Sequence, residues 1–122
     1  MRSLISVRTQ FESLHCYPNA PERVSYLRNV HRHSFFVEAK IEVFHDDREL
    51  EFIIVKEDLS KFIQESLVQR DMDKLVSMSC EMMAKSIMTY LSDSYGSNRR
   101  YFVSVYEDNE NGAEVYSENF FI

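Results

Sequence analysis

Residues 31–43 are His-Arg-His-Ser-Phe-Phe-Val-Glu-Ala-Lys-Ile-Glu-Val, a run in which apolar and polar side chains alternate from Val37 onward. Successive side chains of a β-strand point to opposite faces of its sheet. The alternation therefore predicts a half-buried strand over residues 31–44. His31 and His33 stand two apart at its start, so both imidazoles should project side by side from one face.

The segment before this strand supplies a third histidine. Residues 4–15 alternate in the same way and predict another strand, which ends at His15. Residues 16–30 predict a loop that holds both prolines of the chain. A loop of this length inside a compact domain is more often functional than incidental.

Three imidazoles with an open fourth position are the ligand set of a catalytic zinc ion. His15, His31 and His33 are therefore candidate ligands, and Zn²⁺ is the candidate cofactor. A structural interpretation stays open, in which one histidine of the pair lies at the sheet edge and the other is hydrogen-bonded in the core. His45 falls in a predicted turn and is expected at the surface.

The rest of the chain predicts a mixed architecture. After the turn at 45–47, residues 48–55 predict a third strand segment, and the spacing of Leu59, Phe62, Ile63 and Leu67 predicts a helix. The remaining predicted elements are helices over 56–70 and 80–94 and strands over 100–107 and 113–121, the strands joined by an Asn-Gly hairpin turn within 109–112. This order predicts one α+β domain over 1–122, an antiparallel sheet with two helices on one face.

Composition limits the classes of partner. The chain has 122 residues, of which 44% are hydrophobic and 28% charged, with a net charge of −6. An acidic balance argues against nucleic-acid binding. The pairs Arg23 with Arg28 and Arg99 with Arg100 are expected to be solvated or to meet a small phosphate-bearing ligand. Two cysteines, no signal-like N-terminus and no run of ~20 apolar residues predict a cytoplasmic protein without a membrane span.

Three further features are candidates for chemistry. Cys80 begins a predicted helix behind the N-cap Ser79, where a thiol pKa can fall, although a partly buried thiol is the plainer interpretation. Asp73 and Lys74 would serve proton transfer if buried, and would otherwise be a solvated loop pair. Glu107 ends a predicted strand and could accept from two adjacent N–H groups of a purine or pterin, or simply be exposed.

Four ordered segments carry a resemblance to a known family. Those segments are Phe11-Glu-Ser-Leu-His15, Tyr17-Pro-Asn-Ala-Pro with Val30-His-Arg-His-Ser-Phe35, Met78-Ser-Cys-Glu-Met-Met-Ala84 and Tyr106-Glu-Asp108. In this order they resemble the F-x-A-x-H, Pro-loop with H-G-H-x-[FY], P-[TS]-[TSC]-E-x-x-A and [KY]-E-T motifs of the 6-pyruvoyl- and 6-carboxy-tetrahydropterin synthases. The resemblance covers nearly the whole chain.

The resemblance implies a tunnelling fold and a zinc-dependent carbon–oxygen lyase. It implies that the three histidines bind Zn²⁺, that Glu107 anchors the pterin ring, and that Ser79 and Cys80 line its pocket. The implied substrate is 7,8-dihydroneopterin triphosphate or a related pterin, as in queuosine biosynthesis. The implied assembly is a homo-oligomer, a trimer or hexamer, with sites at subunit interfaces.

The chain departs from the family pattern where proton transfer is concerned. Leu27 stands where the family has its catalytic cysteine, and Met72-Asp73-Lys74 replaces L-D-H, so that a lysine replaces the histidine. Arg32 replaces the glycine within H-G-H. Three functions therefore stay open. The first is an enzyme that uses Cys80, Glu22 or Lys74 for proton transfer, and the second is a non-catalytic oligomeric binder of a pterin or guanine-like nucleotide. The third is an oligomeric scaffold whose pocket is vestigial.

Overall fold

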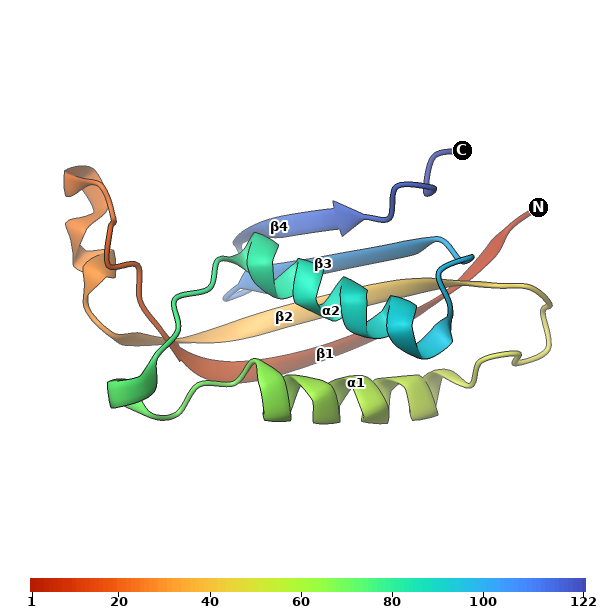
Figure 1. The fold of residues 1–122 in the computed structure, drawn as a ribbon, viewed down its shortest axis with the longest axis horizontal. Coiled ribbons are helices and arrows are strands. Elements are labelled where there is room, and N and C mark those ends of the chain that lie inside the picture. Colours follow the sequence, from red (N-terminus) through yellow and green to blue (C-terminus); the bar gives the residue numbers. More distant parts are fainter.

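A computed structural model describes residues 1–122 as one four-stranded antiparallel sheet with two α-helices on one face (Figure 1). The strands follow one another across the sheet in chain order. The elements are β1 (Ser3–His15), η1 (Glu22–Arg28), β2 (His31–Val43), α1 (Phe52–Ser66), η2 (Met72–Lys74), α2 (Cys80–Tyr95), β3 (Tyr101–Glu107) and β4 (Asn111–Tyr116), with η marking short 3₁₀ helices. The predicted ββααββ order and α+β class are confirmed.

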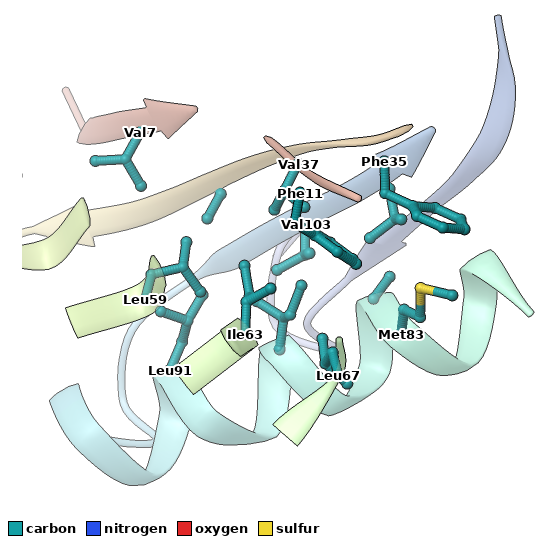
Figure 2. Close-up of a cluster of buried hydrophobic side chains, with 14 of the residues drawn as sticks. Val7, Phe11, Phe35, Val37, Leu59, Ile63, Leu67, Met83, Leu91 and Val103 are labelled. Atoms are coloured by element: carbon teal, nitrogen blue, oxygen red, sulfur yellow. The ribbon is translucent and has the colours of Figure 1, made fainter. Parts of the chain in front are cut away.

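The core lies between the sheet and the two helices, as Figure 2 shows. Alternate residues of each strand face this layer, so Phe35, Val37, Ala39 and Ile41 of β2 are all buried. The helices contribute side chains at helical spacing. These include Val55, Leu59 and Ile63 from α1 and Met83, Ile87 and Leu91 from α2. The expected apolar faces of both helices are thus buried against the sheet.

The predicted third strand segment over 48–55 is wrong. Residues 48–51 form a turn and bend, and α1 begins at Phe52 rather than at residue 56. The Glu51 carboxylate accepts hydrogen bonds from the N–H groups of Ile53 and Ile54 and so caps the helix. Because Val55 already belongs to the buried helical stripe, the apolar run that resembles a strand is the first turn of α1.

The hairpin between β3 and β4 turns earlier than predicted. Its turn consists of residues 108–110, and Asp108 and Asn109 adopt left-handed φ angles of 51° and 57°. Gly112 instead lies in β4 opposite Tyr106, where an added β-carbon would clash with the Val105 carbonyl oxygen. The glycine therefore serves close backbone approach rather than the turn. β4 also ends at Tyr116, and residues 118–121 form further turns.

Arg99 and Arg100 are ion-paired in a partly buried network, not solvated as expected. The Arg99 side chain is 11% exposed and pairs with Glu49 at 2.5 Å. It also donates to the carbonyl oxygens of Tyr95 and Glu42. Arg100 pairs with Glu42 at 3.1 Å. These contacts tie the connection after β2 to the start of β3.

The two outer strands are open on one side. β1 pairs only with β2, and β4 pairs only with β3. The predicted loop over 16–30 contains η1, which projects from the end of the sheet opposite the two chain termini (Figure 1). None of the helices combines the length and the apolar character that crossing a bilayer requires.

Candidate functional site

The three histidines lie together at one end of the helix-covered face of the sheet. His15 of β1 is the direct neighbour of His31 on β2, and His33 is the next residue of β2 on the same face. The ring centroids are separated by 5.1 Å between His15 and His31, 4.7 Å between His31 and His33, and 5.9 Å between His15 and His33. The strand register alone thus gathers three imidazoles from two segments 16 residues apart.

Two of the imidazoles have their Nδ1 atoms fixed by neighbours. His31 Nδ1 donates to the Asn29 carbonyl oxygen at 2.6 Å, and His33 Nδ1 donates to the Asp108 carboxylate at 2.8 Å. These bonds leave Nε2 as the free acceptor nitrogen of each ring. His31 Nε2 is buried and has no hydrogen-bond partner. A buried polar atom left without a partner is costly, and so marks a place where a ligand is expected.

Glu107 faces the same cluster from the end of β3. One carboxylate oxygen lies 3.4 Å from His15 Nε2, and the other lies 3.8 Å from His33 Nε2. Burial lowers the pKa of His15, while the Glu107 charge acts in the opposite direction and the other two histidines lower this pKa further. The neutral imidazole, which is the form that binds metals, is therefore favoured at His15.

A pocket of about 560 Å³ lies beside the histidines at the start of α2. It brings together the predicted ring anchor Glu107 and the predicted pocket residues Ser79 and Cys80. The other lining residues are His15, Cys16, Tyr17, Leu27, Ser77, Met78, Glu81, Met82, Asn111 and Gly112. Leu27 thus lines the pocket, and an apolar side chain stands at the position where the resemblance places a catalytic cysteine.

Cys80 does not have the lowered pKa that its helix position suggests. Burial raises the pKa of its thiol to about 11, and the charges of Glu107 and Glu81 act in the same direction. A hydrogen bond with the Glu107 backbone opposes this shift without overcoming it. Because burial and two carboxylates outweigh the helix dipole, the thiol stays protonated at neutral pH.

The remaining candidates lie outside the pocket. Asp73 and Lys74 belong to η2 and are exposed, so within one chain they do not join the histidines. Glu22 is exposed and pairs with Arg28, whose guanidinium also donates to the Ala20 carbonyl oxygen. Within one chain, Glu22, Asp73 and Lys74 are therefore absent from the lining of the pocket.

The imidazole nitrogens at this site are of a type that suits a zinc ion. Imidazole nitrogens are preferred zinc ligands, and ligating histidines commonly donate their other N–H to a carboxylate or a backbone carbonyl, as His33 and His31 do here. The structure contains no group of three histidine, cysteine or carboxylate side chains whose donor atoms are arranged to hold a metal ion. The Glu107 carboxylate lies against His15 and His33 instead.

Three contributors to the site are not evident from sequence patterns. Asp108 and the Asn29 carbonyl hold the histidine rings, and Cys16 lines the pocket beside His15. Asp108 directly follows Glu107 in the Tyr-Glu-Asp segment, and this adjacency is the one available signal. Its contact with His33 depends on the left-handed turn, which strand alternation does not reveal.

An antiparallel sheet covered by two helices, with three histidines and a carboxylate at one end of the covered face, defines a small α+β domain with one candidate site. The family model for 6-pyruvoyl tetrahydropterin synthase matches residues 4–118, and the chain belongs to this family. The match confirms the family resemblance and is consistent with the tunnelling-fold order of elements. It suggests a function like that of the pterin synthases. A search of the curated proteins found no match.

Proposed function

We propose that this chain is a zinc-dependent, 6-carboxy- or 6-pyruvoyl-tetrahydropterin synthase-like protein acting on 7,8-dihydroneopterin triphosphate or a related pterin. The observation that supports it most is the shared location of the three histidines and Glu107 beside one pocket. The family match supports the pterin class of ligand. Oligomers with sites completed between subunits form part of the same proposal.

In this proposal His15, His31 and His33 hold the zinc ion through their Nε2 atoms. Zinc bound there would supply a Lewis acid that lowers the pKa of a coordinated hydroxyl. The Glu107 carboxylate accepts hydrogen bonds from adjacent N–H groups of the ring, a contact strengthened by its charge. Ser79 and the protonated Cys80 thiol border the ring, and Leu27 adds apolar surface to the pocket.

The first experiment is a product assay by mass spectrometry. Zinc-loaded protein is mixed with 7,8-dihydroneopterin triphosphate, and loss of triphosphate is followed. Turnover that disappears in His31→Ala and Glu107→Gln, but persists in Glu110→Gln, is the expected result. Glu110 is an exposed carboxylate in the same hairpin, so its variant controls for the change of charge. Unchanged turnover in His31→Ala would contradict the zinc mechanism.

A second candidate function is favoured by Leu27 and Cys80. Because Leu27 is apolar and the pKa of Cys80 is raised, the pocket has no cysteine thiolate that could accept a proton at neutral pH. A non-catalytic binder of a pterin or guanine-like nucleotide would need no such group. Calorimetry that detects Glu107-dependent binding of 7,8-dihydroneopterin triphosphate, together with recovery of the intact compound, would favour the binder. Absence of both binding and turnover would contradict both functions.

A further inference from the structure

Asp108 joins the hairpin turn after β3 to the start of β2. Its carboxylate accepts from His33 Nδ1 at 2.8 Å through one oxygen and from the Ser34 backbone N–H at 3.2 Å through the other. Its own backbone N–H donates to the Ser34 carbonyl oxygen at 2.7 Å. Three hydrogen bonds therefore hold Asp108 against His33 and Ser34.

The contact determines which nitrogen of His33 carries the proton. A carboxylate at 2.8 Å only accepts, so the proton resides on Nδ1, and Nε2 keeps its lone pair. That Nε2 lies 3.8 Å from one oxygen of the Glu107 carboxylate, whose other oxygen lies 3.4 Å from His15 Nε2. At His31 the equivalent partner is a backbone carbonyl, whereas at His33 it is a side chain that substitution can remove.

We propose that Asp108 is a positioning residue for metal binding, which holds the His33 ring in the Nδ1–H tautomer with Nε2 directed at the ion. This inference rests on the proposed zinc site. It assigns a role to a residue outside the three histidines and Glu107. Partners of this type affect metal affinity because they fix both the tautomer and the orientation of the ligand.

The backbone of the turn provides a matched pair of variants. Asp108 and Asn109 both adopt left-handed φ angles, of 51° and 57°. Glycine takes such angles without steric cost. Asp108→Gly therefore removes the carboxylate and keeps the backbone hydrogen bond to Ser34, while Asn109→Gly makes the same backbone change next to it without removing a partner of His33.

The experiment measures zinc affinity by competition with a chromophoric chelator and the His33 tautomer by ¹⁵N NMR of the metal-free protein. Asp108→Gly is expected to weaken zinc binding about 10- to 100-fold and to shift His33 away from the Nδ1–H form. Asn109→Gly is expected to match the wild type in both. Asp108→Asn, which keeps an acceptor oxygen but loses the charge, should give intermediate affinity.

Each outcome decides a separate question. Equal zinc affinity in the two glycine variants, or an unchanged Nδ1–H signal in Asp108→Gly, would reduce Asp108 to a turn residue and overturn the inference. A wild-type protein that binds no zinc would overturn the proposed function. In that case the tautomer of metal-free His33 in the two glycine variants still tests whether Asp108 sets it. If Asp108→Gly does not fold, Asp108→Asn carries the same comparison.

Discussion

Glu49 and Arg99 illustrate how much of the connection between β2 and α1 depends on two side chains. They are 50 residues apart in sequence, and their side chains are only 19% and 11% exposed. Glu49 also accepts from the Phe44 backbone N–H at 2.6 Å. The pair therefore fixes a turn that contains little other regular structure. Arg99 adds a cation–π contact with the Phe44 ring, 4.5 Å from its centroid.

The ion pair predicts a specific dependence of stability on pH. Hydrogen bonds from Arg99 and then from Phe44 lower the pKa of Glu49 from 4.5 to about 2. Because the folded-state pKa is the lower one, the stabilisation is complete above about pH 4.5 and is lost as the pH falls toward 2. Urea unfolding between pH 5 and about 2 should show this loss in the wild type and less of it in Glu49→Gln.

The control is Glu65→Gln, which changes an exposed carboxylate of α1. It should lose stability with pH as the wild type does. A Glu49→Gln protein with the same pH dependence as Glu65→Gln would contradict the role given to the pair.

At the scale of single residues, the sequence predicts well which face of the sheet a side chain lies on. It predicts poorly which groups that side chain contacts. Strand alternation places His31 and His33 on one face, and the structure brings His15 beside them. The hydrogen-bond partners of the rings could not be predicted in this way, because the Asp108 contact requires a left-handed turn that residue spacing does not reveal. The raised pKa of Cys80 could not be predicted from the sequence either, because it depends on burial and on the charge of Glu107, which lies at the end of β3.

Helix α1 shows the limit of periodicity at the scale of an element. The apolar run Phe52-Ile-Ile-Val55 suits a strand as well as a helix, and short runs of this type cannot be separated by pattern alone. The cap at Glu51 and the buried stripe of Val55, Leu59 and Ile63 decide in favour of the helix. The strands that carry the histidines were predictable because each alternates over a longer segment.

Removal of the cap should destabilise the domain measurably. Glu51→Ala leaves the N–H groups of Ile53 and Ile54 without their side-chain acceptor, at an expected cost of about 1 kcal/mol in the free energy of unfolding. Glu57→Ala, at an exposed position of the same helix, is the control for charge and helix propensity. Equal stability of the two variants by urea denaturation would show that the cap contributes nothing.

The open edges of the sheet matter at the scale of the whole molecule. Unpaired strand edges readily pair with another chain. The Ser117 N–H donates to the Tyr101 carbonyl oxygen, and bonded positions alternate along an antiparallel pair, so the N–H of Glu114 points away from β3. The edge of β4 thus offers donors to a neighbouring chain, in line with the proposed oligomer.

Glu114→Pro should therefore weaken assembly without unfolding the chain. Proline removes an N–H that β3 does not use, and edge strands tolerate it. We expect light scattering after size exclusion to show oligomers for the wild type and for Glu114→Ala, which separates loss of the side chain from loss of the N–H. Glu114→Pro should give mainly single chains. A monomeric wild type, or unchanged oligomers in Glu114→Pro, would contradict the edge contact.

The even number of strands has a geometric consequence. Because four antiparallel strands alternate in direction, β1 and β4 run in opposite senses. A rotated copy can place its β4 beside β1 and continue the alternation without a break. Each such addition pairs one edge and leaves another open until the ring closes. Head-to-tail growth of this kind ends only when the last copy meets the first. We therefore expect closed rings and single chains to dominate over open intermediates.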